Sequence, residues 1–451
     1  MVVQKFGGTS VADSDAIRRL IEIVRSARAR DGAGPAVVVS AMSKVTDTLL
    51  DIAVTAGDGR ADEALARVEQ LRERHVAAAR ALAPKADALV AAIGSELDSL
   101  TAVVRALAVL REVSPRTLDV VAAMGELLSS RLVAAALTSA GVEAEWVDAR
   151  LALVTDGEHM RATPLYPDTN DALRVHVTSV IDRGRVPVLG GFVGATRDGH
   201  TTTLGRGGSD YSGALVGAGI GADEIQIWTD VDGMLTADPR IVAGAQLVPH
   251  LSFDEAAELA YFGAKVLHPS TIIPAVERDI PVRILNARKP DGGGTIITAK
   301  AEPSEAMLTG LACKRDITVV DIRSSRMLMA HGFLSRVFEV FDRFRTAVDV
   351  VTTSEVTVSV TVDDTRQLDA IVEALSEFAI VTIERDMALL CAVGDRLRNE
   401  PAIAARAVGV FEEVPLRMIS QAASGRNITV ILRQADLSHA MHRLHEEFFA
   451  S

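Results

Sequence analysis

The chain has 451 residues, of which 48% are hydrophobic and 24% charged, and its formal net charge is −13. This length suits two or three domains with cores of their own, and the acidic balance excludes wholesale binding of nucleic acid. Cys313 and Cys391 form no metal or redox spacing, which indicates a reducing compartment. The first residues lack the layout of a signal peptide, and no apolar run approaches the ~20 residues that span a bilayer. We therefore expect a cytoplasmic protein without a membrane or nucleic-acid partner.

The first elements predict a parallel sheet. The sequence predicts a strand at residues 2–6, a glycine turn at 7–10, an amphipathic helix at 13–29 and a buried strand at 36–40. This order is a βαβ unit. Lys5 lies at the end of the first strand, beside the turn, and is a candidate phosphate-binding cation, although most lysines are simply solvated.

Helices and further buried strands follow. The stretch 61–141 is rich in Ala, Leu, Glu and Arg and predicts several helices, with breaks near Pro84 and Pro115. Buried strands are predicted at 186–190, 224–228 and 280–286. Helices are predicted at 211–219 and 253–262, and FGAKVLHP begins another.

The stretch from Thr201 to Arg240 contains two polar turns within 40 residues. In the first, glycines surround Arg206, and Ser209 and Asp210 precede a helix, so that free N–H groups beside a cation favour an anion. In the second, a strand ends at Thr229 and Asp230, where α/β proteins place ligands. Either turn alone is more typical of ordinary structure, but together they favour a binding site.

After residues 291–294 the chain changes character, and a repeat with an offset of 70 residues emerges. The paired positions are Phe341 with Phe411, Val348 with Met418, Ser354 with Ser424, Val360 with Val430, and Phe378 with Phe448. Helix, strand, turn, strand and helix occur twice, which predicts two small α+β modules. Their sheet edges favour pairing with each other or with another subunit. The linker is expected near residues 288–305.

Both the motifs that are missing and the motifs that are present limit the reactions that this chain could catalyse. No P-loop, protein-kinase set or dinucleotide fingerprint occurs. However, KFGGTSVAD, GELLSSRL, TTTLGRGGSDYS, IWTDVDGMLTADPR and FGAKVLHP occur in order. With these motifs the chain resembles the aspartokinases along nearly its whole length. The resemblance implies an α/β amino-acid-kinase fold, a mostly parallel sheet between helices, in residues 1–295. It also implies a regulatory region, 306–451, of two α+β ACT-like modules, at about 316–386 and about 387–451, the latter with the 306–315 strand.

The implied activity is ATP-dependent phosphorylation of the side-chain carboxylate of L-aspartate to 4-phospho-L-aspartate, the first step toward aspartate-derived amino acids. A carboxylate of pKa ~4 is ionised at neutral pH and needs no general base, so positioning and charge neutralisation carry the catalysis. The implied cofactor is ATP with Mg²⁺, with no dedicated metal ligands in the protein.

The resemblance also assigns site residues. Lys5 and Asp210 are the catalytic pair. The implied substrate contacts are Ser40, Thr46, Glu126, Arg206 and Asp210, with Arg206 on the α-carboxylate and the two acids on the ammonium. The implied nucleotide contacts are Lys5, Gly7, Gly8, Thr9, Ser10, Thr229, Asp230, Arg240 and Lys265. Leu235 stands where many relatives have Tyr, which puts an aromatic contact there in doubt.

An amino-acid effector site is implied in the first module. Its residues are Met327, Gly332, Phe333, Leu334, Val348, Asp349, Ser354 and Glu355. Lysine is the expected effector, with threonine as the second candidate, because Ala330 removes a hydroxyl that lysine-sensitive relatives often have. A homo-oligomer through the ACT-like modules is expected, either dimer or tetramer. Two alternatives stay open: an amino-acid kinase for glutamate, acetylglutamate or a nucleotide, and a non-catalytic amino-acid sensor.

Overall fold

The computed structural model describes residues 1–32, 34–205, 207–264, 267, 269–300, 307–324, 331–422 and 424–450. The chain forms two compact units. The first unit contains Met1–Met234, Pro249–Phe253 and Val266–Ala301, and the second contains Leu235–Val248, Asp254–Lys265 and Glu302–Ser451. Each unit is considered by itself.

An eight-stranded sheet organises the first unit, in the order β3-β5-β2-β1-β8-β10-β11-β9. Its strands are β1 (Val2–Phe6), β2 (Ala36–Val39), β3 (Ala144–Val147), β5 (Val186–Gly190), β8 (Glu224–Thr229), β9 (His250–Ser252), β10 (Val282–Asn286) and β11 (Thr295–Thr298). All neighbouring pairs are parallel except β10 with β11. The predicted parallel sheet is thereby confirmed. A separate sheet joins β4 (Val154–Thr155), β6 (Val193–Thr196) and β7 (Thr201–Thr203).

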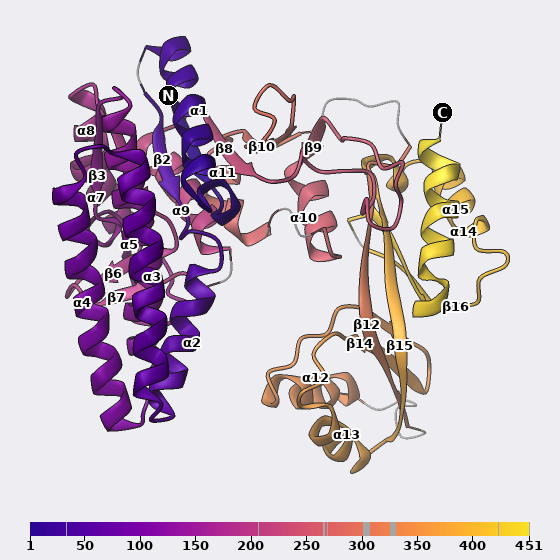
Figure 1. Ribbon diagram of the computed structural model, residues 1–451. Coiled ribbons are helices and arrows are strands. Elements are labelled where there is room, and N and C mark those ends of the chain that lie inside the picture. Colours follow the sequence, from indigo (N-terminus) through magenta and orange to yellow (C-terminus); the bar gives the residue numbers. More distant parts are fainter. Residues whose placement is uncertain are drawn as a thin grey trace. The chain divides into compact units, whose positions relative to one another are not determined.

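Helices surround this sheet. They are α1 (Ser14–Asp31), α2 (Val45–Gly57), α3 (Ala61–Leu82), α4 (Asp87–Leu110), α5 (Pro115–Ser139), α6 (Ala149–Ala152), α7 (Tyr166–Leu173), α8 (Ser179–Asp182), α9 (Gly208–Ile220) and α11 (Ile273–Val276). Helix α10 (Phe253–Tyr261) belongs to the second unit from Asp254 on. The Asp13 carboxylate starts α1 by accepting the Ala16 N–H at 2.8 Å, which satisfies one of the free donors of the first turn. Helices α3, α4 and α5 lie alongside one another, as the Ala- and Leu-rich stretch predicts (Figure 1).

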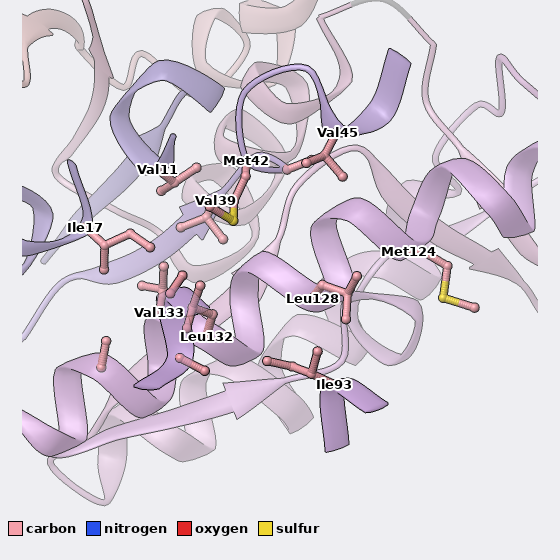
Figure 2. Packing of buried hydrophobic residues seen from close by; sticks show 14 of the residues in the cluster. Val11, Ile17, Val39, Met42, Val45, Ile93, Met124, Leu128, Leu132 and Val133 are labelled. Carbon is pink, nitrogen blue, oxygen red and sulfur yellow. The ribbon is translucent and has the colours of Figure 1, made fainter. Parts of the chain in front are cut away.

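Helix α5 runs through the core of the first unit. Its residues Leu128, Leu132 and Val133 pack with Val39 of β2 and Ile17 of α1 (Figure 2). By length and composition α5 could cross a membrane, yet 83% of its most apolar window is buried inside the protein. Its apolar character is therefore explained by packing. Because α5 is fixed by this core, the polar residues that it carries have fixed positions too.

The second unit is built on one six-stranded sheet, in the order β13-β14-β12-β15-β17-β16. Its strands are β12 (Gly310–Arg323), β13 (Val351–Thr353), β14 (Thr357–Val362), β15 (Ile380–Val393), β16 (Leu416–Gln421) and β17 (Asn427–Arg433), and its helices are α12 (Phe333–Arg343), α13 (Leu368–Ser376), α14 (Pro401–Gly409) and α15 (Leu437–Phe449). Helix, two strands and helix occur twice, as the 70-residue repeat predicts. Strands β12 and β15 run through both modules, with α12 and α13 toward one end and α14 and α15 toward the other (Figure 1).

The two long strands are interrupted at equivalent positions. Asp316 in β12 and Asp386 in β15 have φ of +58° and +56°, and they are separated by the repeat offset of 70 residues. The β12–β15 register shifts beside Asp316. A left-handed non-glycine residue is uncommon, so the matching pair marks where each strand passes from one module to the other.

The compact units differ from the predicted front domain of residues 1–295. Leu235–Val248 and Asp254–Lys265 belong to the second unit. Ala237 and Val242 are buried in an apolar cluster with residues of β12, β15 and α15, among them Leu311, Leu390 and Leu444. Because these earlier residues pack in the core of the second unit, no single linker in the sequence separates the two units.

Candidate active site

A cavity of about 790 Å³ lies in the first unit, where β1, β2 and β8 end and where α2 and α9 begin. Ten predicted site residues line it: Lys5, Gly7, Gly8, Thr9, Ser40, Thr46, Glu126, Asp210, Thr229 and Asp230. They come from segments up to 225 residues apart in the sequence, so the fold brings together the separate motifs. The carboxyl ends of parallel strands and the N-terminus of a helix are the usual place for a phosphorylated ligand.

Lys5 and Asp210 form an ion pair at one wall of the cavity. The Lys5 Nζ lies 2.6 Å from the Asp210 Oδ1, and the side chains are 8% and 17% exposed. Lys5 is held by its place in β1, which pairs with β2 and β8, and Asp210 lies in the first turn of α9. The partly buried pair places an ammonium group in the cavity with a defined direction.

Glu126 is a buried carboxyl on α5 that faces the same cavity. Its Oε1 accepts the Ala41 N–H at 3.2 Å, whereas its Oε2 has no hydrogen-bond partner among the described residues. Burial raises the pKa of Glu126 to about 8, although the Ala41 hydrogen bond and the charge of Lys5 oppose this. At Gly190 an added Cβ would lie 2.9 Å from the Glu126 Cβ, so only glycine allows this approach of β5 to α5.

The glycine turn after β1 is fixed by its own backbone. The Gly7 N–H donates to the Trp228 carbonyl at 2.9 Å. The structure places Ser10 differently from the other residues of this turn: its hydroxyl is buried and donates to the same carbonyl at 3.2 Å, and Ser10 does not line the cavity. Its hydroxyl therefore supports the turn, and a phosphate contact from it has no support in this geometry.

Three predicted site residues, Arg206, Lys265 and Met327, lie outside the described residues. Arg240 belongs to the second unit, where its guanidinium is held by the Asp238 carboxylate at 2.6 Å. Its predicted nucleotide contact stays a prediction.

Other residues line the cavity without having been predicted: Met42, Ser43, Lys44, Asp47, Leu50, Met160, Phe192 and Ser209. Lys44 precedes α2 with φ of +65°. Such a φ usually indicates glycine in a sequence, but here the residue is a lysine, in the turn that follows β2. Met160 also has a left-handed φ of +69°. A sequence pattern identifies neither: the Met160 N–H donates to Asp119, which is 41 residues away, and Lys44 is a non-glycine residue with a left-handed φ.

The predicted effector residues of the second unit are placed in part. Gly332 precedes α12 with φ of +80°, and Phe333 and Leu334 begin the helix. The Asp349 carboxylate, 6% exposed, is already paired with the Lys314 Nζ at 3.0 Å and 3.1 Å. Ser354 and Glu355 are exposed. Asp349, which is predicted to hold a cationic group of the effector, is therefore already paired with Lys314 of this chain. The sequence does not predict this pair.

Comparisons with known proteins agree with this geometry. Residues 1–286 match the amino acid kinase family, and residues 390–448 match an ACT domain family. The chloroplastic aspartokinase 3 of Arabidopsis thaliana is 38% identical over 466 residues, which cover 99% of this chain and 81% of that protein. The lysine-sensitive aspartokinase 3 of Escherichia coli is 35% identical over 457 residues, which cover 100% of this chain and 99% of that protein.

Solved structures are similar along the same length. The structure of E. coli aspartokinase III in complex with aspartate and ADP, in the R-state, has a TM-score of 0.86 at 34% identity and covers 100% of both chains. The same protein in complex with lysine and aspartate, in the T-state, has a TM-score of 0.84 at 34% identity and covers 100% of this chain and 99% of that one. Because the family match, the sequence identity and the fold agree along nearly the whole chain, the chain belongs to the aspartokinase family and is an enzyme of the amino acid kinase fold.

Proposed function

We propose that this enzyme transfers the γ-phosphoryl group of ATP to the side-chain carboxylate of L-aspartate, giving 4-phospho-L-aspartate and ADP. The observation that carries the proposal is the buried Glu126, whose Oε2 has no hydrogen-bond partner among the described residues and which lines the same cavity as Lys5. A buried carboxylate needs a compensating cation, and the ammonium of an amino acid supplies one. The related E. coli enzyme has been solved with aspartate and ADP, which supports the same assignment.

The reaction needs no general base. One oxygen of the aspartate side-chain carboxylate attacks the γ-phosphorus, the bond from that phosphorus to the β–γ bridging oxygen breaks, and ADP leaves with that electron pair. Lys5 neutralises charge that develops on the transferred group, and Asp210 directs the Lys5 side chain. The N–H groups of Gly7, Gly8 and Thr9 hold phosphate oxygens. Ser40 and Thr46 contact aspartate, and Thr229 and Asp230 contact the adenosine side.

Mg²⁺ accompanies the nucleotide in this proposal. The described residues contain no group of three or more His, Cys, Asp or Glu side chains that would hold a metal ion. This fits an ion carried mainly by the phosphates and water, as is usual for Mg²⁺ at kinase sites. When bound, it neutralises phosphate charge.

The test is ATP turnover with L-aspartate in the presence of hydroxylamine, which traps an acyl phosphate as the hydroxamate. We expect aspartyl hydroxamate from the wild-type enzyme and a loss of about 10²-fold or more for Lys5→Met, because the charge acts mainly on the transition state. L-Glutamate in place of L-aspartate is the control for side-chain length. Folded, ATP-binding protein that yields no hydroxamate would overturn the proposal and favour a sensor.

We further propose that the second unit binds L-lysine as an inhibitor beside Gly332, Asp349 and Glu355. The E. coli relative is named lysine-sensitive and has been solved with lysine, which supports this choice. In this chain an effector ammonium shares or displaces the Lys314 contact with Asp349.

The edge strands β13 and β16 of the sheet favour a homo-oligomer through the ACT-like modules. Light scattering at several protein concentrations measures that assembly.

A further inference from the structure

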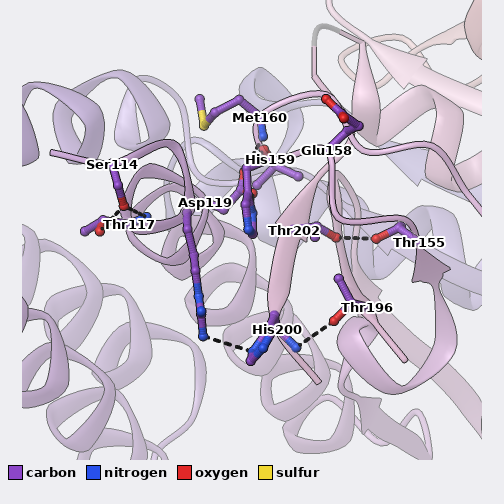
Figure 3. A network of polar contacts seen from close by, with 12 residues as sticks. Ser114, Thr117, Asp119, Thr155, Glu158, His159, Met160, Thr196, His200 and Thr202 are labelled. Carbon is purple, nitrogen blue, oxygen red and sulfur yellow. Dashed lines mark hydrogen bonds and ion pairs between the residues drawn. The ribbon is translucent and has the colours of Figure 1, made fainter. Parts of the chain in front are cut away.

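Asp119 on α5 is a buried carboxylate that is not among the predicted site residues. Its side chain is fully buried, and three donors from two other segments converge on it. The His159 Nδ1 lies 2.6 Å from Oδ2, and the Met160 backbone N–H donates to Oδ1 at 3.0 Å (Figure 3). The Thr203 hydroxyl donates to the same Oδ1 at 2.5 Å. Removal of the carboxylate would leave all three donors without this acceptor in the interior.

The three segments that meet at Asp119 are walls of the active-site cavity. Asp119 lies seven residues, about two turns, before Glu126, so both project from the same face of α5. Met160 belongs to the loop 156–163 between β4 and α7 and lines the cavity. Thr203 ends β7, and Gly205 and Gly207, just after it, also line the cavity.

Met160, whose N–H is bound to Asp119, has an unfavourable backbone conformation. Met160 has φ of +69°, a left-handed value that a non-glycine residue adopts only when its surroundings require it. Its N–H in this conformation is the group bound to Asp119. Next to it, Gly205 has φ of +75°, and an added Cβ there would lie 3.3 Å from the Met160 carbonyl oxygen. The 156–163 loop and the glycine turn after β7 are therefore fitted to one another around this carboxylate.

We propose that Asp119 is a positioning residue for aspartate binding: it holds the 156–163 loop and the end of β7 so that Met160 and the glycine turn form the wall of the substrate pocket. The inference rests on the proposed aspartate kinase function. It assigns Asp119 no contact with substrate and no part in the chemistry. Its effect is on the affinity for aspartate, because the nucleotide contacts at Gly7, Gly8 and Thr229 lie on other segments.

The chain offers a matched pair of variants on neighbouring residues of β7. Thr203→Val removes one donor to Asp119 without changing side-chain volume. Thr202→Val makes the same change at a buried residue whose hydroxyl instead contacts the Thr155 hydroxyl at 2.6 Å (Figure 3). Asp119→Asn is the stronger variant, because its amide cannot accept all three donors.

Steady-state kinetics and hydrogen exchange test the inference together. For Asp119→Asn we expect the KM for aspartate to rise on the order of tenfold or more, with a smaller change in kcat and a KM for ATP within about twofold. For Thr203→Val we expect a rise of about fivefold, and for Thr202→Val none. Amides of residues 157–162 should exchange faster in Asp119→Asn, whereas those of β1 should not.

Two results would overturn the inference: an unchanged KM for aspartate in folded Asp119→Asn, or equal KM values for Thr203→Val and Thr202→Val. If Asp119→Asn does not fold, the threonine pair decides. A fall in kcat with an unchanged KM for aspartate is a case of the first result and would mean a merely structural role. Failure of the proposed function is distinguishable, since it shows in the wild-type enzyme, as absence of hydroxamate.

Discussion

Lys5 and Asp210 show how two residues 205 positions apart depend on one another. Each charge is the near neighbour of the other at 2.6 Å, so the removal of either leaves a partly buried charge uncompensated. We expect Lys5→Met and Asp210→Asn each to lower kcat by about 10²-fold or more, and the double variant to lose much less than the product of the two effects. Hydroxamate formation at saturating ATP and aspartate measures this. Multiplicative losses would mean that the two residues act independently.

We expect Glu126 to make aspartate binding depend on pH. Its pKa of about 8 leaves it largely neutral at pH 7, and only the ionised form attracts the aspartate ammonium. We therefore expect the KM for aspartate to fall as the pH rises from about 6.5 to 8.5, because binding releases the proton. Glu126→Gln should bind aspartate more weakly and show no such slope. A wild-type KM that is constant across this range would contradict the assignment.

A rise in pH that strengthens aspartate binding through Glu126 should at the same time lower the free energy of unfolding. The folded protein keeps the Glu126 proton up to about pH 8, whereas the unfolded chain releases it near the ordinary value of 4.5. Between these values the folded state holds more protons, so the free energy of unfolding falls as the pH rises, and it levels off above pH 8. Urea denaturation without substrate should show this slope in the wild type and a shallower one in Glu126→Gln.

Strand β12 carries Lys314 into contact with the predicted effector site. Lys314 lies 3.0 Å from Asp349 and 3.3 Å from Asp363, and its ammonium is 4.9 Å from the centre of the Tyr261 ring. Burial and Asp349 raise the pKa of Tyr261 to about 12, so the phenol stays neutral. If an effector ammonium binds Asp349 as proposed, Lys314 competes with it for that carboxylate.

We expect Lys314→Met to increase sensitivity to lysine, with the half-inhibiting concentration lowered about tenfold, because Asp349 then lacks its internal cation. Asp349→Ala should abolish inhibition and spare basal activity. Arg366→Met is a matched control, since it breaks an exposed pair with Asp364 in the same module. Inhibition curves at fixed aspartate measure the effect. Equal curves for Lys314→Met and the wild type would exclude this competition.

Strands and helices with strong local patterns were predictable from the sequence. Val2–Phe6 is followed by a glycine turn, Val186–Gly190 is an apolar run that ends at a glycine, and both are strands with those bounds. The two-residue strand Val154–Thr155 has no such pattern and exists because it pairs with β6. The cavity residues with glycine or hydroxyl motifs were predictable as a group. Asp119 and Lys314 were not, because an acid on a helix and a lysine in a strand are usually solvated, and only the tertiary partners distinguish them.

At the scale of the whole molecule, the two units share the chain in alternating segments. Ala237 and Val242 are 4% and 5% exposed and pack against residues after Leu308. A chain cut after residue 301 would expose these side chains, and a fully buried valine alone stabilises by about 1.5–3 kcal/mol. We expect this truncated chain to aggregate or bind a hydrophobic dye, unlike the full chain. Gel filtration and dye fluorescence check this; a soluble, active fragment would show that the first unit folds alone.

Strands β12 and β15 are each 14 residues long and belong to both ACT-like modules. Such a strand extends about 46 Å, at about 3.3 Å per residue. The two modules are therefore connected by the same pair of long strands. We expect a rotation of one module to twist β12 and β15 and so to reach the other module. Asp316 and Asp386 are the points where that torsion would be released. We therefore expect a ligand bound in one module to change the other module through the two strands that they share.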